Sequence, residues 1–303
     1  MYLTDFTLPI YEEENIIQGV ASSNGGKYGY IDNPYPCGLF KDKGLEQLIF
    51  DKITVIYGGN GSGKSTLLNI IAKKLELNRV SPYNTSETFD AYVERCSFSL
   101  GYDDEGFKHR IPNGSRIITS DDVFDYMLTV RTNNDEISEG KLIAKEKYNS
   151  TKRDLFLGKS IQFGGMDDYE AFRDLLLIRS KSVSRREYIR RVAGKEVKMN
   201  SNGETALEYF DSKLKNDTLY CLDEPENSLS PSMQLKLKGI IEEMARYCGC
   251  QFVIATHSPF LLAMKNAKIY DLDSEKVCVK NWWELENTRI YFDFFNENRE
   301  LFL

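Results

Sequence analysis

One stretch decides the fold of this chain: Gly58-Gly59-Asn60-Gly61-Ser62-Gly63-Lys64-Ser65. It fits the pattern G-x-x-x-x-G-K-[ST] at every fixed position. The β-branched apolar run over 53–57 is typical of a buried strand, and the apolar spacing over 66–75 is typical of a helix packed on a sheet. Because a phosphate-binding loop needs a strand before it and a helix after it, the stretch predicts such a loop.

The residue types in this loop have chemical reasons. Glycines let the backbone curl so that successive N–H groups point at an anion, and the helix that follows adds the positive end of its dipole. We expect Lys64 to reach the β- and γ-phosphates and the Ser65 hydroxyl to ligate Mg²⁺. The loop therefore predicts a nucleoside triphosphate site. Its predicted binding residues are Gly58, Asn60, Gly61, Ser62, Gly63, Lys64, Ser65 and Thr66.

A second motif supplies carboxylates. The apolar run 219–222 reads as a strand that ends in Asp223 and Glu224. Asp223 at this edge can hold Mg²⁺ through water, opposite Ser65. Glu224 is then placed to orient or deprotonate the water that attacks the γ-phosphate. Many strands end in an acidic turn, but this one follows a clear phosphate loop.

Two further segments carry polar residues where a ligand could bind, one at the end of a strand and one at the start of a helix. The strand-like run 251–256 delivers His257 to the carboxyl edge of a sheet, where ligands bind in such folds. The stretch Asn200-Ser201-Asn202-Gly203-Glu204 precedes an apolar helix pattern. Ser201 can cap this helix with Glu204 closing a capping box, or the helix start can hold an anion.

Composition narrows the class of protein. With 303 residues, 41% of them hydrophobic, the chain can bury one large core or two small ones. Its net charge of -7 argues against a global electrostatic grip on DNA or RNA. No run of about 18 apolar residues and no secretory leader pattern is present, and the cysteines are scattered. We expect a soluble, cytoplasmic protein without a membrane contact.

The pattern along the chain indicates one α/β domain over residues 1–303. Residues 1–57 alternate short strand-like runs with turns and predict a β-rich lobe leading into the loop. Residues 131–200 predict a helical, charged insertion. Alternating helix and strand over 204–272 predicts a mainly parallel sheet flanked by helices. The aromatic tail over 282–303 predicts a final packed helix.

The ordered set of motifs at 58–66, 201–204, 219–224, 228–230 and 255–258 resembles an ABC-type ATPase head. It looks like the AAA/ABC-like predicted ATPases of bacteria that are related to SMC, double-strand-break repair and OLD-type ATPases. The resemblance covers nearly the whole chain. It implies a P-loop NTPase fold of the ABC type, with ATP and Mg²⁺ as ligands and ATP hydrolysis as the activity.

The resemblance also implies roles for single residues. Ser201, Gly203 and Glu204 would touch ATP that is held by a second subunit, and the loop 228–230 would cross the dimer interface. His257 would sense the γ-phosphate and act in catalysis with Lys64 and Glu224. The implied assembly is a homodimer that closes over two sandwiched ATP molecules and opens after hydrolysis.

The sequence departs from the family pattern at several places. The 200–204 stretch lacks the Leu-Ser-Gly-Gly-Gln of transporter heads, and Ser230 stands where many relatives have Asp. The usual coupling glutamine is not placed: Asp121 or Asp122 occupies its position, and Gln162 is a poorer candidate. Candidates for stacking on the adenine are Tyr28, Tyr30 and Tyr35.

The segment Arg179–Lys198 has the strongest local charge bias of the chain. It reads as a solvated helix face, as a contact to the phosphate backbone of DNA or RNA, or as a docking surface for an acidic partner. Only Tyr188 is interleaved, which argues against base stacking.

The function hypotheses follow. The first is an ATP-driven dimer switch that serves DNA maintenance or defence against phage with a separate effector such as a nuclease, because no nuclease-like acidic cluster follows the motifs. The second is the nucleotide-binding subunit of a membrane transporter, against which the unusual 200–204 stretch counts. A scaffold with negligible turnover is the third.

Overall fold

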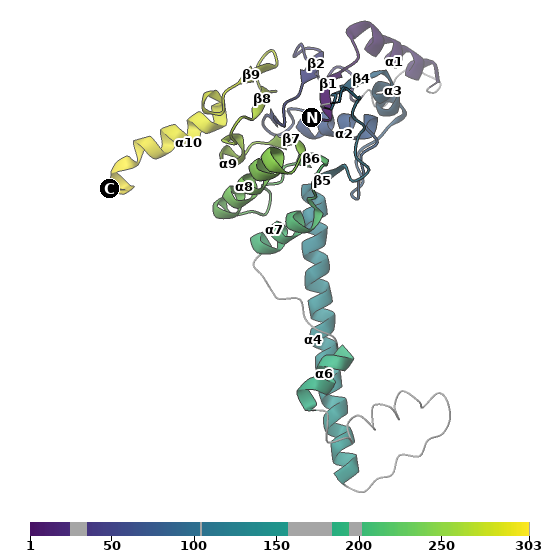
Figure 1. The fold of residues 1–303 in the computed structure, drawn as a ribbon, viewed down its shortest axis with the longest axis vertical. Coiled ribbons are helices and arrows are strands. Elements are labelled where there is room, and N and C mark those ends of the chain that lie inside the picture. The colour runs from purple at the N-terminus through teal and green to yellow at the C-terminus, as the bar shows by residue number, and fades with distance from the viewer. Residues whose placement is uncertain (25–34, 104, 157–183, 194–201, 303) are drawn as a thin grey trace. The chain divides into compact units, whose positions relative to one another are not determined.

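The computed structural model describes residues 1–24, 35–103, 105–156, 184–193 and 202–302 (Figure 1). The chain forms two compact units. The first joins Met1–Phe124 with Asn202–Leu303, and the second is Asp125–Ser201. The single domain with an insertion over 131–200 stays a prediction, because the two units do not test the bounds of that insertion.

A six-stranded sheet forms the centre of the first unit, with strand order β5-β6-β7-β3-β8-β9. All neighbours pair in parallel except β8 and β9, which are antiparallel. Every residue of β3 and β7 is buried, as expected for parallel strands covered on both faces. The predicted mainly parallel sheet is confirmed. Its strands are β3 Ile53–Tyr57, β5 Arg116–Thr119, β6 Leu219–Asp223, β7 Gln251–Thr256, β8 Lys268–Asp271 and β9 Cys278–Lys280.

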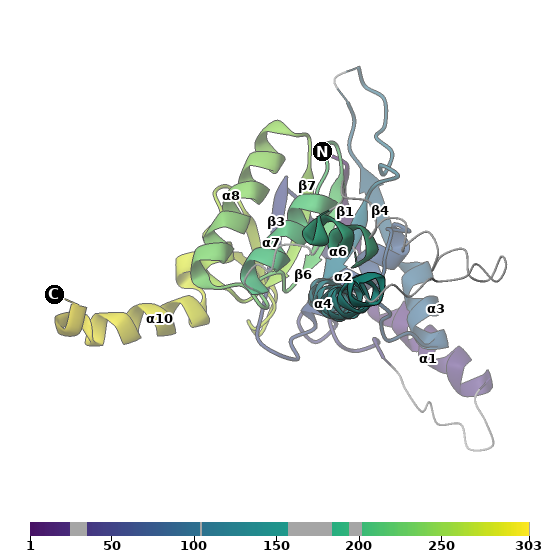
Figure 2. The same ribbon diagram turned by 90° about the horizontal axis from the view of Figure 1, so that it is seen from below.

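Helices cover both faces of this sheet (Figure 2). Helix α2 (Lys64–Lys74) lies on one face against β6 and β7. Helix α8 (Pro231–Tyr247) packs on β7 from the other side, with α7 (Asn202–Lys213) and α9 (Pro259–Leu262) against it. The α2 side chains Leu67, Leu68, Ile70 and Ile71 are fully buried in the core. The phosphate loop is thereby anchored to the most buried helix of the unit.

A smaller antiparallel sheet of order β2-β1-β4 lies beyond α2 and shares its core. The prediction of strands alone over 1–57 misses the helix α1 in this lobe. Three glutamates in its first turn, Glu12 to Glu14, favour a helix start and were the available signal. The elements of the lobe are β1 Leu3–Thr7, α1 Tyr11–Asn24, β2 Gln47–Ile49, α3 Glu87–Arg95 and β4 Ser97–Leu100.

The second unit contains two described helical segments. Helix α4 (Ser120–Phe156) begins in the first unit, near the Asp121 start that the sequence indicates, and continues through residues of the second. Helix α6 (Arg185–Ala193) adds Tyr188, which packs on Ala144 and Tyr148 of α4. None of the described helices combines the length and the apolar character needed to cross a membrane.

The C-terminal tail is helical, as predicted, but most of its aromatic side chains are not packed. It consists of the 3₁₀ turn η2 (Trp282–Glu284), helix α10 (Glu286–Glu297) and η3 (Arg299–Phe302). Several large aromatic side chains along α10 are about half exposed. The prediction of a packed final helix is therefore wrong in its second part. Apolar residues lie on several sides of α10, so a single buried face cannot cover all of them.

Candidate functional site

Local sterics shape the loop between β3 and α2. Gly61 and Gly63 have φ of 81° and 102°, a left-handed conformation that only glycine adopts without strain. A Cβ on Gly58 would clash with the Ser62 hydroxyl and lie 2.8 Å from the Ser62 Cβ. Within the described residues the buried Ser62 hydroxyl has no hydrogen-bond partner. The loop is thus a tight curl with an unsatisfied polar atom, which fits an anion.

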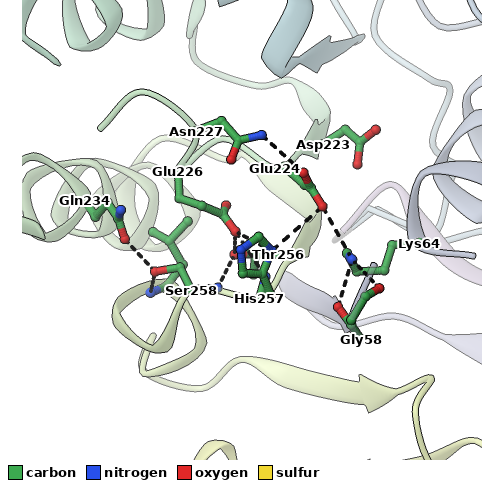
Figure 3. Close-up of polar contacts among 12 residues, drawn as sticks. Gly58, Lys64, Asp223, Glu224, Glu226, Asn227, Gln234, Thr256, His257 and Ser258 are labelled. Atoms are coloured by element: carbon green, nitrogen blue, oxygen red, sulfur yellow. Dashed lines mark hydrogen bonds and ion pairs between the residues drawn. The ribbon is translucent and has the colours of Figure 1, made fainter. Parts of the chain in front are cut away.

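Lys64 begins α2 and folds back over this curl (Figure 3). Its Nζ donates to the carbonyl oxygens of Gly58 at 2.8 Å and Gly59 at 3.0 Å. The same Nζ lies 3.4 Å from Oε1 of Glu224. The Lys64 side chain is 4% exposed, so a negative group brought into the loop would meet a poorly hydrated positive charge.

Ser65 and Asp223 meet although they are 158 positions apart. The Ser65 hydroxyl donates to Oδ1 of Asp223 at 3.0 Å. Burial raises the pKa of Asp223 to about 6, although the Ser65 hydrogen bond acts in the opposite direction. A hydroxyl oxygen and a carboxylate are hard oxygen ligands, so this pair fits Mg²⁺.

Glu224 follows β6 in a strained conformation, with φ of 47°. A left-handed backbone at a residue other than glycine costs about 1–3 kcal/mol and concentrates at functional sites. The turn is held because the Glu224 N–H donates to the Ala255 carbonyl at 2.9 Å. Asn227 Nδ2 donates to Oε2 of Glu224 at 3.1 Å and so orients the carboxylate. Sequence reasoning missed Asn227, for which an amide three residues after the acid was the only signal.

His257 follows β7 and faces two carboxylates (Figure 3). Its Nδ1 lies 3.8 Å from Oε1 of Glu224 and 3.5 Å from Oε1 of Glu226. Glu226 also accepts hydrogen bonds from the Thr256 hydroxyl at 2.6 Å and from the His257 N–H at 3.0 Å. Burial raises the pKa of Glu226. No motif in the sequence assigns Glu226 a role of its own.

The predicted partner-facing residues form a separate group. Ser201 lies outside the described residues, whereas Gly203 and Glu204 are in the first turn of α7. A Cβ on Gly203 would lie 3.3 Å from Met233 Cγ and 3.8 Å from the Ser228 carbonyl oxygen. The structure therefore places Gly203 beside the loop 228–230, in which Ser228 has φ of 69°.

Two other candidates are engaged in local contacts. Asp122 is buried and accepts hydrogen bonds from the backbone and hydroxyls of Ser81 and Thr119, so it closes the start of α4. The Tyr35 hydroxyl donates to Thr66 at 3.0 Å, which places Tyr35 next to the phosphate loop. Gln162, Tyr28 and Tyr30 lie outside the described residues, as do positions 179–183 and 194–198 of the basic segment.

Comparison with known families matches residues 93–263, more than half of the chain, to the family described as "AAA domain, putative AbiEii toxin, Type IV TA system". The chain belongs to this family. This family confirms the prediction of an ABC/AAA-like ATPase head, and it agrees with the mainly parallel sheet of the structure. No curated protein gives a significant match.

Solved structures similar to this AAA domain include ATPase heads. One is a nucleotide-free ATP-binding cassette from an ABC transporter, at 17% identity and TM-score 0.39, covering 97% of this chain and 96% of that chain. An Smc head domain from Pyrococcus furiosus has 16% identity and TM-score 0.38, covering 86% and 97%. A dimeric ATP-binding cassette bound to ADP and phosphate has 17% identity and TM-score 0.36, covering 78% and 90%.

Proposed function

We propose that the protein binds ATP with Mg²⁺ in the loop 58–65 and hydrolyses it. The observation that carries this proposal is the convergence of Lys64, Asp223 and Glu224, with His257 at the edge of the same cluster. Ser65 and Asp223 would hold the ion, directly and through water. Bound there, Mg²⁺ would neutralise the negative charge that develops on the phosphates.

The protein's own residues would divide the remaining work. Lys64 exchanges its bonds to the loop carbonyls for the β- and γ-phosphate oxygens and stabilises their negative charge. Glu224 orients the attacking water and accepts its proton, while Asn227 holds the carboxylate in place. His257, next to Glu224, contacts the γ-phosphate.

We further propose that two copies close over two ATP molecules and separate after hydrolysis. Support comes from the first turn of α7, where Gly203 lies beside the loop 228–230, so that the two predicted interface segments form one surface. A helix start presents free N–H groups and a positive dipole end, which suits the γ-phosphate on a partner copy.

The variant Glu224→Gln tests this function. The amide keeps the shape but cannot take the proton, so we expect ATP to bind normally and hydrolysis to fall by about 10²–10⁴-fold. Light scattering with ATP and Mg²⁺ should show a stable dimer. The matched control is the double variant Lys64→Ala with Glu224→Gln, which should stay monomeric. A Glu224→Gln protein that remains monomeric at saturating ATP contradicts the switch.

The biological role rests on the family. Its description names an AbiEii toxin of a type IV toxin–antitoxin system, which supports a role in DNA maintenance or defence. That a separate effector protein carries out this role is our inference. Isolation of the tagged protein from its host, with and without ATP, identifies the partner. Recovery with a nuclease or a nucleic-acid-binding protein supports this role, and recovery with a membrane protein supports the transporter alternative.

A contact of Arg179–Lys198 with DNA or RNA remains a separate proposal. Phosphate contacts release counterions, so their affinity falls steeply with salt. Titration of labelled DNA and RNA at two salt concentrations tests it. An affinity that does not depend on salt excludes phosphate-backbone binding by this segment.

A further inference from the structure

Glu226 holds the end of β7 with a single carboxylate oxygen. Oε1 accepts from the Thr256 hydroxyl and from the backbone N–H of His257, and it is also the oxygen nearest to His257 Nδ1. Glu226 is 5% exposed, so water cannot replace these partners. Its other oxygen, Oε2, has no hydrogen-bond partner among the described residues. Burying an ionised carboxylate costs free energy, and the hydrogen bonds from Thr256 and His257 offset that cost only in part.

The contacts around His257 show how its imidazole ring is held in place. The His257 side chain is 39% exposed, and its Nδ1 has no hydrogen bond within the described chain. Its two nearest carboxylates stand at 3.5 and 3.8 Å, longer than a hydrogen bond. The ring is therefore placed mainly by its backbone, and that backbone is fixed by Glu226.

Ser258, the residue after His257, is held by a hydrogen bond to α8. The Ser258 hydroxyl donates to Gln234 Oε1 at 2.6 Å, and Gln234 Nε2 donates to the Leu229 carbonyl at 2.9 Å. Leu229 N–H itself donates to the Glu226 carbonyl at 2.9 Å. Figure 3 shows the bond between Ser258 and Gln234. Together these hydrogen bonds link the segment after β7 to the loop 228–230.

We propose that Glu226 is a positioning residue for His257. Its carboxylate sets the direction in which the imidazole leaves β7 and presents an acceptor to Nδ1 when the site tightens around a nucleotide. Hydrogen bonds of this kind are often long in the empty state and shorten in the reacting complex. The inference rests on the proposed function, because it assumes that His257 contacts the γ-phosphate.

Steady-state ATP hydrolysis by Glu226→Ala and Glu226→Gln tests the proposal. A displacement of about 1 Å at a catalytic group can cost about 10²-fold, so we expect kcat of Glu226→Ala to fall by about 10–100-fold with KM within about threefold. Glu226→Gln should retain more activity, because its amide oxygen can still accept from Thr256 and from the His257 N–H. The matched control is Glu242→Gln on α8, whose Oε1 accepts a backbone N–H from Lys265, away from the site.

A double-mutant cycle separates positioning from general support of the fold. If Glu226 acts through His257, adding Glu226→Ala to His257→Ala should lower kcat no further. A loss of equal size in both backgrounds, or a wild-type kcat in Glu226→Ala, overturns the proposal. Thermal melting of each variant shows which of them fold.

A spectroscopic readout does not require turnover. The chain has two histidines, His109 and His257, so imidazole NMR signals can be assigned by replacing either one. In the folded Glu226→Gln protein the His257 ring signals should shift and the His109 signals should not. Unchanged His257 signals overturn the inference. If the His257 signals shift in Glu226→Gln but the wild-type protein shows no ATPase activity, the placement of the ring is supported and the proposed function is refuted instead.

Discussion

At the residue scale, steric contact shapes the phosphate loop as much as hydrogen bonding does. Gly58 faces Ser62 so closely that a methyl group has no room, whereas a Cβ on Gly59 would meet Asp273 Oδ2 at 3.6 Å, an ordinary contact. Gly59 N–H also donates to that carboxylate oxygen at 2.7 Å. An added methyl group therefore has room at Gly59 but not at Gly58.

Gly58→Ala is therefore expected to distort the curl and weaken ATP binding by at least about tenfold, equivalent to about 1.4 kcal/mol. Gly59→Ala is the matched control and should cost much less. Calorimetric titration with a non-hydrolysable ATP analogue measures both. Equal affinities of the two variants would contradict the steric account.

At the element scale, the Gln251 side chain links the large sheet to the small one. Gln251 in β7 accepts from the N–H groups of Tyr2 and Leu3, and it donates to the Leu3 carbonyl oxygen at 2.7 Å. Gln251 is 1% exposed and Leu3 is 0% exposed, so the backbone groups of Leu3 in β1 have no alternative contact with water.

Gln251→Leu keeps a similar volume but leaves buried backbone groups without a partner. Each such group costs about 1–3 kcal/mol, so we expect a lower free energy of unfolding by about 2–4 kcal/mol. Urea unfolding followed by circular dichroism measures the difference. A midpoint unchanged from wild type would show that β1 is held by other contacts.

The end of β8 carries an ion pair with a pH dependence. Asp271 Oδ2 accepts from Lys280 of β9 at 2.7 Å and from the Ser274 hydroxyl. Burial opposes ionisation of Asp271, but the hydrogen bonds from Lys280 and Ser274 outweigh it and lower its pKa from the ordinary 3.8. The same hydrogen bond raises the pKa of Lys280 above 10.5.

These two pKa shifts determine how the stability of the fold changes with pH. A lowered carboxyl pKa stabilises the fold above the ordinary pKa, and this contribution disappears as pH falls through the folded value. We expect Asp271→Asn to melt below wild type at neutral pH, with the difference shrinking below about pH 4. On the alkaline side the difference should shrink again above the pKa of Lys280. Melting curves from about pH 3 to 8 test the acid limb, and a gap that widens in acid would contradict it.

At the scale of the whole molecule, the proposed active site needs two chains. In a face-to-face dimer each site takes its phosphate loop from one copy and its 201–204 segment from the other. Lys64→Ala damages the first half, and Gly203→Asp places a negative charge in the second.

Neither variant alone should hydrolyse ATP, but a mixture should. A mixed dimer has one site in which both halves are intact, so equal amounts of the two proteins should recover phosphate release. The control is each protein mixed with itself at the same total concentration. Absence of recovery, with both variants folded and mixed dimers demonstrated by dual tags, would show that sites are not shared between copies.

Much of the fold could be predicted because its signals are local. The loop 58–65 has a pattern tied to phosphate chemistry, and the runs around β3, β6 and β7 are continuous because buried parallel strands have no polar face. The meeting of Ser65 and Asp223 was also predictable, since both follow parallel strands of one sheet. Helix α1 was missed because turn residues on either side hid its acidic start.

The sequence by itself determined the parallel sheet and the position of the glycine-rich loop between β3 and α2, because those depend on residue type and short-range spacing. Only the tertiary structure decided how Asn227 holds Glu224, how Glu226 holds the backbone of His257, and which aromatic side chains of α10 stay exposed. The reason is physical. Hydrogen bonds between turns and burial of a helix face depend on register and side-chain direction across elements, and no short-range pattern encodes these.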